Sequence, residues 1–316
     1  MSNTNTSTNN NNEVSKRLRS FLKTAKKPLI VIFGPTASGK TAISLDLAHK
    51  FKGEIISTDS RQLYTEMEIG TDAILPEQQE GIPHHLLGIA KPDKTITAAE
   101  YTELALAKIK EIYARKHIPI LVGGTGLYIS SILFSYQIPH VPPNEKLRDK
   151  LYKEAEKKGN EYVHKKLVKL DPEAAKKIHP NNLRYVVRAL EINLTTGANK
   201  IDLQKKSPFQ PFLISLNWPR EKLYERVNLR VDLQLKRGLL DEVKKLLKKG
   251  YKENSPAMSS LGVKEIIPYI KGKSTLEECV ELLKKNTRNY AKRQMTWFRK
   301  YDNVLAELNI VKLNYE

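Results

Sequence analysis

The residues of this chain with the most specific chemistry lie in one eight-residue loop. Residues 34–41 read Gly-Pro-Thr-Ala-Ser-Gly-Lys-Thr and follow an apolar run, 28–33. This is the G-x-x-x-x-G-K-[ST] pattern, in which glycines turn backbone N–H groups toward a phosphate, the lysine adds charge and the last hydroxyl can contact Mg²⁺. The pattern predicts a site for a diphosphate or triphosphate, formed by Gly34, Pro35, Thr36, Ala37, Ser38, Gly39, Lys40 and Thr41, with Thr41 at the Mg²⁺. Kinases, ATPases and some transferases share this loop, so it predicts a ligand class and leaves the reaction open.

Two polar residues follow other apolar runs. Asp59 comes after the run 54–57, and Thr125 lies in a second glycine loop that follows the run 118–122. A carboxylate there can contact Mg²⁺ indirectly or act as a general base, although aspartate also caps turns. The Thr125 hydroxyl can hydrogen-bond the oxygen that joins a leaving diphosphate to carbon; the alternative is a plain strand-to-helix turn. Gln62 matches the N6/N7 edge of adenine, but alone it is more typical of a solvated surface.

Basic side chains at helical spacing are a further candidate. Arg226 and Arg230 are four residues apart, so they share one face of a predicted helix. One of them could stabilise the charge of a diphosphate, and the alternative is a solvated basic face. The neighbouring pair His84 and His85 points to opposite sides of a strand, which disfavours a shared metal ion.

The elements that must position these residues alternate along the chain. Apolar runs at 28–33, 54–57 and 118–122 predict strands, and a capping box at Thr97–Glu100 opens a helix between the last two. The alternation predicts an α/β fold of the P-loop NTPase type, a parallel sheet with helices on both faces. Ligands of such sheets bind outside the carboxyl ends of the strands. The two glycine loops and Asp59 should therefore converge on one crevice.

The chain divides by composition into three parts. Residues 1–27 are rich in Asn, Ser and Thr and then in basic residues, which predicts a disordered basic tail, with ordered structure beginning at Pro28. The catalytic core is expected in residues 28–138 and 211–316. Residues 139–210 have prolines at their start and predict a helical insertion domain. Its expected helices are 144–169 and 181–194; in the core we expect a basic helix over 220–249 and a last helix opened by Ser274 and Glu277.

The charge of the chain indicates a polyanionic partner. Lys and Arg number 54 against 35 Asp and Glu, a net charge of +19, although abundant lysine also fits generic solubility. Residues 284–300 hold seven basic residues and no acidic one. The single cysteine, Cys279, excludes a disulfide framework and a cysteine-based zinc finger. No apolar run reaches the roughly 20 residues that span a membrane. We expect the protein to be cytoplasmic, and we also expect a monomer.

Six motifs in order give the chain a family resemblance. It resembles the tRNA isopentenyltransferase (tRNA dimethylallyltransferase) family, of the bacterial type without a zinc finger, over about residues 28–300. The motifs are Gly34–Thr41, Asp59-Ser-Arg-Gln-Leu-Tyr64, Ile82-Pro-His-His-Leu-Leu87, Gly123-Gly-Thr-Gly-Leu-Tyr128, Arg188-Ala-Leu-Glu191 and Tyr290-Ala-Lys-Arg-Gln-Met-Thr-Trp-Phe-Arg299.

The resemblance implies a prenyl transfer to tRNA. Members move a dimethylallyl group from dimethylallyl diphosphate to N6 of the adenosine 3′ to the anticodon, so the P-loop would hold a leaving diphosphate. By resemblance, Asp59 is the general base, while Thr125 and Arg230 hold the diphosphate and its bridging oxygen. The adenine must be flipped out, because a stacked base cannot present N6 to a carbon electrophile in a closed pocket.

The resemblance also implies the contacts with the tRNA anticodon stem-loop. The expected tRNA-binding residues are Asp59, Ser60, Arg61, Gln62, Thr125, Arg148, Arg184, Arg188, Gly262 and Lys264. The chain departs from the family pattern at Asn182, Tyr185 and Val263, among others, where Asp, Arg and Tyr are frequent. These positions face tRNA, so the departures concern affinity and anticodon preference.

Two other functions compete with this interpretation. An adenylate isopentenyltransferase uses free AMP, ADP or ATP as acceptor, but such enzymes lack a large basic insertion. A small-molecule P-loop kinase leaves the charge of +19 unexplained. A non-catalytic RNA-binding protein would be expected to have lost Lys40, Asp59 or Thr125, and the chain has all three.

Overall fold

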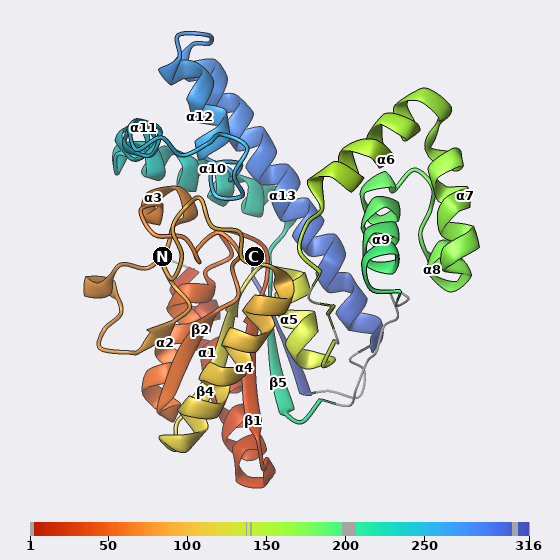
Figure 1. Ribbon diagram of the computed structural model, residues 1–316. Helices are drawn as coiled ribbons and strands as arrows, with labels where there is room; N and C mark the ends of the chain where they lie inside the picture. Colours follow the sequence, from red (N-terminus) through yellow and green to blue (C-terminus); the bar gives the residue numbers. More distant parts are fainter. Residues whose placement is uncertain (1–2, 137, 140, 198–206, 305–308, 316) are drawn as a thin grey trace. The chain divides into compact units, whose positions relative to one another are not determined.

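The computed structural model describes residues 3–136, 138–139, 141–197, 207–304 and 309–315. The chain forms two compact units (Figure 1). One consists of Met1–Leu133 with Ser207–Glu316 and carries the sheet; the other, Phe134–Lys206, is helical. No helix of the described part of the chain is both long and apolar enough to cross a membrane.

The first unit is built on a six-stranded parallel sheet, which confirms the predicted fold class. The strand order is β3-β2-β4-β1-β5-β6, with β1 in the interior. The bounds are β1 Pro28–Phe33, β2 Gly53–Ser57, β3 His84–His85, β4 Ile118–Gly123, β5 Gln210–Asn217 and β6 Asn309–Asn314. Phe33, the last residue of β1, is in register with Gly123 of β4 and with Ser215 of β5. The loops that follow these strands therefore begin at one edge of the sheet.

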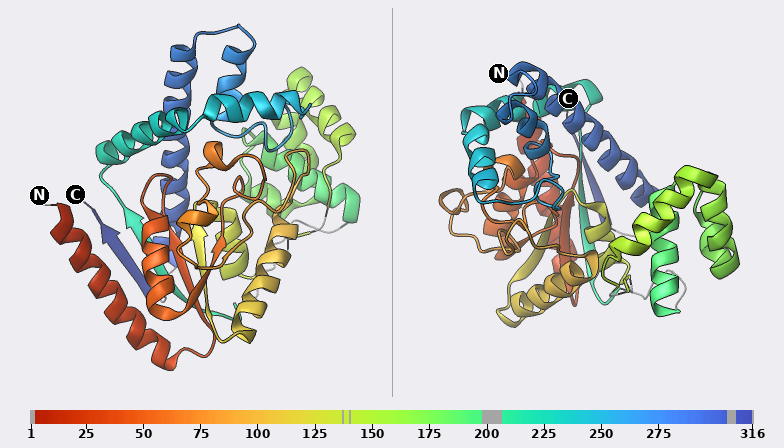
Figure 2. Two further views of the ribbon diagram at one scale, coloured as in Figure 1. Left: turned by 90° about the vertical axis from the view of Figure 1, so that its left-hand side faces the viewer. Right: turned by 45° about the horizontal axis from the view of Figure 1, so that its top comes forward.

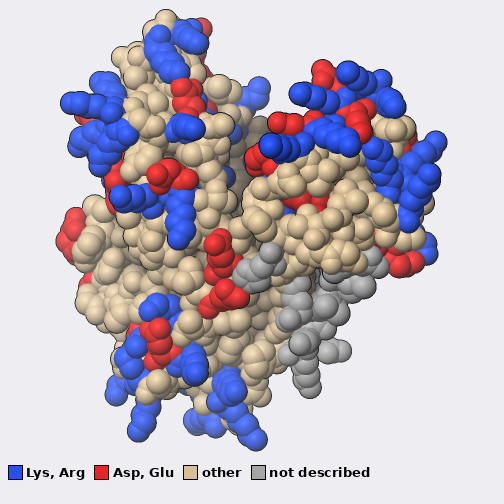
Figure 3. Space-filling model, viewed as in Figure 1, with Lys and Arg blue, Asp and Glu red and all other residues tan. Residues whose placement is uncertain are grey.

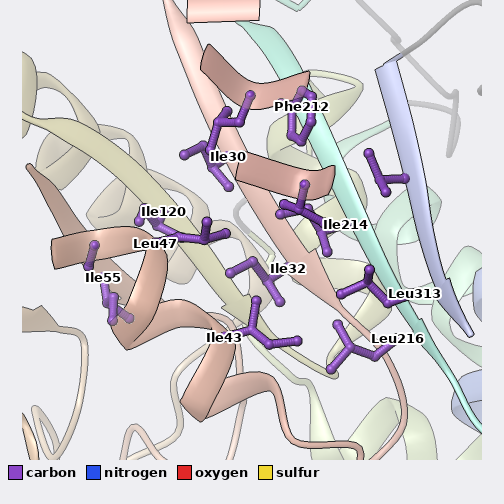
Figure 4. Packing of buried hydrophobic residues seen from close by; sticks show 14 residues of the cluster. Ile30, Ile32, Ile43, Leu47, Ile55, Ile120, Phe212, Ile214, Leu216 and Leu313 are labelled. Carbon is purple, nitrogen blue, oxygen red and sulfur yellow. The ribbon is translucent and has the colours of Figure 1, made fainter. Parts of the chain in front are cut away.

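Apolar side chains cover both faces of the sheet, as in parallel sheets generally. Ile30 and Ile32 of β1 pack with Phe212 and Ile214 of β5 and with Leu47 of helix α2 (Lys40–Phe51) (Figure 4). On the other face, Phe33 packs against aromatic rings of α13 (Leu276–Val304) at centroid distances of 4.9 and 5.4 Å. The P-loop therefore follows a strand that is packed on both of its faces.

The N-terminal segment is the main correction to the predicted organisation. Helix α1 spans Asn3–Thr24 and runs alongside β6 (Figure 2). Val14 and Leu18 are 1% and 0% exposed in the sheet's core, with Phe21 and Leu22 packed beside them. The predicted disordered tail over residues 1–27 is therefore wrong for this helix. Its four apolar residues follow the i, i+4, i+7, i+8 pattern of an amphipathic helix, which the polar composition had masked.

The remaining helices of the first unit cover the sheet and its carboxyl edge. They are α3 Glu68–Thr71, α4 Ala98–Ala114, α5 Gly126–Leu133, α10 Arg220–Lys236, α11 Leu239–Lys248 and α12 Val263–Ile270, with a 3₁₀ turn at Pro76–Gln78. The capping box at Thr97 and Glu100 is confirmed. The helix predicted over 220–249 is two helices, because Gly238 has a φ of 100° that favours glycine and ends α10. The box predicted for the last helix lies one residue later, at Thr275 and Glu278.

The second unit is a four-helix domain with its own core. Its helices are α6 Glu145–Lys158, α7 Asn160–Leu170, α8 Pro172–Lys177 and α9 Leu183–Thr196. Leu151, Val163, Leu167 and Val187 are among its buried residues. The unit begins at Phe134 rather than at residue 139 and ends at Lys206 rather than at 210. The helix predicted over 144–169 is broken at Gly159, whose φ is 85°.

Candidate active site

The P-loop has the backbone of an anion site. It connects β1 to α2, and Ala37 and Gly39 have φ values of 61° and 95°. Such a turn at the start of a helix points N–H groups and the positive end of the helix dipole at a bound anion. The Lys40 ammonium donates to the carbonyl oxygens of Gly34 and Pro35 at 3.1 and 2.7 Å. Burial and the neighbouring Arg230 charge lower the pKa of Lys40 to about 8.

A pocket of about 410 Å³ opens in front of the P-loop. It brings the P-loop together with the end of β2, the second glycine loop and α10. Its lining residues include Thr36–Thr41, Asp59, Gln62, Asp72, Gly123, Arg226, Leu229, Arg230, Leu233, Arg237 and Gln294. The structure therefore assembles the P-loop, Asp59 and Arg230 at one site, at the carboxyl edge of the sheet.

Asp59 lies in the turn that follows β2. Its Oδ1 accepts a hydrogen bond from the Arg61 N–H at 2.9 Å, and its own N–H donates to Ser57 Oγ at 3.3 Å. The carboxylate therefore caps the turn and also lines the pocket. Asp59 therefore has the turn-capping contact that the sequence allowed, and its carboxylate also lines the pocket.

Thr125 is joined to the Asp59 turn by a hydrogen bond. Its Oγ1 accepts from the Ser60 N–H at 3.0 Å, and its N–H donates to the Thr58 carbonyl at 3.1 Å. The Tyr290 hydroxyl is a further hydrogen-bond partner of the Thr125 hydroxyl. These bonds fix the second glycine loop against the turn after β2, as the strand order requires.

Two arginines of α10, Arg226 and Arg230, reach the P-loop. The Arg226 guanidinium donates to the Ala37 carbonyl at 2.8 Å and lies 4.3 Å from the centroid of the Trp218 ring. Arg230 donates to Thr36 Oγ1 and, at 3.1 Å, to the Thr71 carbonyl. The sequence predicted that one arginine could enter the crevice, and the structure brings in two.

Two residues expected at the adenine have structural partners. The Gln62 carboxamide accepts from Ser57 Oγ at 2.9 Å and donates to the Thr71 and Asp72 carbonyls at 3.4 and 3.3 Å. The Arg61 guanidinium donates to the Pro256 carbonyl. Contact of these side chains with a base stays a prediction.

The arginines expected on the insertion lie in the helical unit. Arg148 makes two hydrogen bonds of 2.9 Å to the Glu191 carboxylate, which is fully buried and also paired with Arg188. The Arg148 guanidinium joins α6 to α9, whereas Arg188 pairs with Glu191 within α9 itself. Arg184 instead stacks on the exposed Tyr185 ring at 5.5 Å.

The last pair of expected tRNA contacts lies before and within α12. Gly262 has a φ of 92° and donates its N–H to Glu265 at 3.0 Å. The Lys264 side chain is 49% exposed, with its ammonium 3.6 Å from Glu265.

One residue of α13 was not predicted to belong to the site. Gln294 accepts a hydrogen bond from the Thr36 N–H at 2.8 Å and donates to the Gly124 carbonyl at 3.0 Å. It is only 5% exposed. In the sequence, Gln294 lies in a stripe with Tyr290 and Trp297 at i, i+4 and i+7, a spacing typical of a core face, so no local signal marked it as a site residue.

Comparison with known proteins identifies the family of this chain. The family model described as IPP transferase matches residues 62–301. The chain is 48% identical over 283 residues to the tRNA dimethylallyltransferase of Alkaliphilus metalliredigens, covering 88% of this chain and 91% of the relative. It is 47% identical over 281 residues to that of a Thermoanaerobacter species, covering 87% and 89%.

Solved structures give the same assignment. The tRNA isopentenylpyrophosphate transferase of Bacillus halodurans is 41% identical, with a TM-score of 0.67, over 92% of this chain and 91% of that one. A eukaryotic dimethylallyltransferase acting on tRNA is 32% identical, with a TM-score of 0.78, over 92% of this chain and 74% of that one. By sequence and by fold, this chain belongs to the tRNA dimethylallyltransferase family.

Proposed function

We propose that this chain transfers a dimethylallyl group from dimethylallyl diphosphate to N6 of the adenosine that follows the anticodon of tRNA, with release of diphosphate. The observation that carries the proposal is the hydrogen bond between Ser60 N–H and Thr125 Oγ1 at 3.0 Å. It joins the Asp59 turn to the loop suited to a leaving oxygen. In the reaction, the bond from N6 to the allylic carbon forms, that carbon's bond to the bridging oxygen breaks, and diphosphate leaves with the electron pair.

The P-loop and the arginines of α10 would bind the diphosphate. In the structure, Lys40 and Arg226 donate to carbonyl oxygens of the P-loop. Phosphate oxygens are charged acceptors, and hydrogen bonds to charged acceptors are stronger than those to carbonyls. These cations would therefore turn to the diphosphate and stabilise the charge that develops as it leaves.

Asp59 would take the proton from N6. The lone pair of an adenine amine is delocalised into the ring, so the amine needs a proton acceptor as its new bond forms. Asp59 lines the same pocket as the P-loop. Its turn is joined to Thr125 by the hydrogen bond from the Ser60 N–H to Thr125 Oγ1. A positioned general base contributes about 10²–10⁴ in rate.

Magnesium fits this pocket by the chemistry of its donors. The Thr41 hydroxyl and the carboxylates of Asp59 and Asp72 are among the lining groups, and Mg²⁺ prefers such oxygen ligands. Among the described residues, no group of three or more His, Cys, Asp or Glu is arranged to hold a metal alone. The ion would therefore share the diphosphate with Thr41, and when bound it would neutralise part of the diphosphate charge.

The tRNA would be held through its phosphates. Lys and Arg side chains are spread over the surface, the insertion helices included (Figure 3). In the first unit, a second pocket of about 300 Å³ adjoins Gly34 and Pro35. Among the described residues, the charged side chains that line it are Arg220, Lys292, Arg299 and Lys312. Cationic side chains suit the RNA backbone. Every residue used in this proposal lies on one chain, so a monomer suffices.

The pocket also bears on the competing functions. Leu229 and Leu233 of α10 line it and are 59% and 47% exposed, so they offer apolar surface that a five-carbon group can cover. A kinase that binds only phosphates and a polar acceptor has no use for that surface. A free nucleotide acceptor has no use for a separate helical domain of residues 134–206.

One experiment separates these functions. Unmodified tRNA is incubated with the protein, Mg²⁺ and dimethylallyl diphosphate, and nucleosides are analysed by mass spectrometry. We expect one dimethylallyl group on the adenosine after the anticodon, and none on tRNA with guanosine there. Prenylation of AMP but not of tRNA would support the adenylate enzyme, and consumption of ATP with a phosphorylated product would support the kinase.

A further inference from the structure

One face of α13 lies on the catalytic loops. Tyr290, Gln294, Trp297 and Tyr301 are spaced at i, i+4, i+7 and i+11, so they form one stripe. All four reach the second glycine loop or its flanks: Tyr290 contacts the Thr125 hydroxyl, Gln294 the Gly124 carbonyl, and Tyr301 donates to the Gly126 carbonyl at 3.2 Å. The ring of Trp297 lies against Gly126.

The glycines of this loop are required by the helix. A Cβ on Gly124 would lie 2.1 Å from Gln294 Nε2, and a Cβ on Gly126 would lie 2.1 Å from the Trp297 ring. Neither glycine has a positive φ, so backbone freedom is not the reason for them. The loop has glycines because α13 is packed directly on it.

Gln294 ties the two glycine loops together. Its carbonyl accepts from Thr36 of the P-loop and its amino group donates to Gly124 of the second loop. A carboxamide is the side chain that offers an acceptor and a donor side by side. Because the residue is 5% exposed, water does not compete for these two bonds.

We infer that Gln294 is a positioning residue of the transfer reaction. It fixes the spacing between the loop that holds the diphosphate and the loop that holds its bridging oxygen. The inference rests on the proposed function and adds to it that α13 shapes the leaving-group site.

A pH profile tests the role of Gln294. The variant Gln294→Glu keeps the acceptor for Thr36 but places an oxygen against the Gly124 carbonyl. A protonated carboxyl donates as the amide does, so the ratio of variant to wild-type rate should rise as pH falls. A ratio that stays constant with pH would overturn the bridging role. The wild type in the same assay distinguishes the two proposals: without its transfer activity the proposed function fails, and with it only the positioning role of Gln294 is in question.

Discussion

Charged side chains at the two edges of the sheet have different kinds of partner. At the amino edge, Glu54 of β2 is 2% exposed and meets three cationic or ionisable partners. Arg115 donates to it at 2.9 and 2.7 Å, His85 lies at 2.6 Å and His117 at 2.8 Å. At the carboxyl edge, Lys40 and Arg226 face neutral carbonyl oxygens of the P-loop.

The difference separates structural charge from functional charge. The Glu54 carboxylate is neutralised within the fold, so the free energy of its ion pairs and hydrogen bonds is already part of the stability of the protein. Lys40 and Arg226 donate to carbonyl oxygens that a phosphate can replace. Their stronger hydrogen bonds to phosphate therefore contribute to the free energy of binding. Mutations at one edge should therefore change stability, and mutations at the other should change catalysis.

The largest effect is expected at the carboxyl edge. Asp59→Asn should lower the single-turnover rate by about 10²–10⁴, because a carboxamide cannot take the N6 proton. The amide oxygen can still accept from the Arg61 N–H, so the thermal midpoint and the tRNA affinity should change little. Single-turnover assays, filter binding and thermal unfolding measure the three quantities. If turnover stays near normal, Asp59 is only a turn residue.

At the amino edge, the effect should fall on stability. The hydrogen bonds from Arg115, followed by those from the histidines, hold the pKa of Glu54 at about 2, below its ordinary value of 4.5. A lowered pKa stabilises the fold above the unfolded value, and the contribution is lost as pH falls from about 4.5 to about 2. Glu54→Gln should therefore cost about 3 kcal/mol at pH 7, with activity per folded molecule unchanged.

Urea unfolding at two pH values checks this prediction. The gap between wild type and Glu54→Gln should shrink between pH 7 and pH 3. The surface pair of His49 and Glu80 supplies a control, because Glu80 is 57% exposed and Glu80→Gln should have little effect at either pH. An equal gap at both pH values would show that the Glu54 charge is not the source of the stability.

The third effect concerns the charge of Lys40. Its pKa of about 8 means that the ligand-free lysine loses its proton above that pH. A diphosphate binds the protonated form, so its affinity should fall by up to about tenfold for each pH step above 8. Calorimetry with inorganic diphosphate between pH 7 and 9.5 measures this. Lys40→Met is the control, since the diphosphate ionises in the same way but the lysine is absent. If log affinity for diphosphate falls with pH as steeply in this variant as in the wild type, the effect comes from the ligand.

The sequence was sufficient where the topology of the sheet determines position. The P-loop, Asp59 and Thr125 each follow a strand, and parallel strands end at one edge, so their convergence could be predicted without side-chain detail. The bond between Ser60 and Thr125 links residues 65 positions apart in the way this rule requires. Helical spacing predicted that Arg226 or Arg230 could enter the crevice, and the family resemblance singled out Arg230.

The sequence was insufficient where side chains distant in the chain decide the structure. Gln294 bonds to Thr36 across 258 positions, and no local pattern distinguishes it from a core residue. The buried face of α1 depends on four apolar residues in a polar segment, which composition averages out. Glu54 shows no sign in the sequence that Arg115 and two histidines would surround it, since its partners come from β3 and from the connection into β4.

The smallest effect should be on tRNA binding at the cations beyond the P-loop. Arg299→Ala in the second pocket should flatten the plot of log affinity against log salt by about 0.7–0.9 if it contacts one phosphate, with a modest loss of affinity at physiological salt. Lys292→Ala should do the same, whereas Lys110→Ala on the exposed face of α4 should leave the slope unchanged. Filter binding from 50 to 200 mM salt, a range over which phosphate contacts change affinity strongly, gives the slopes. If both pocket variants keep the wild-type slope, the phosphates are bound elsewhere, and the basic surface beside Gly34 has a role in solubility only.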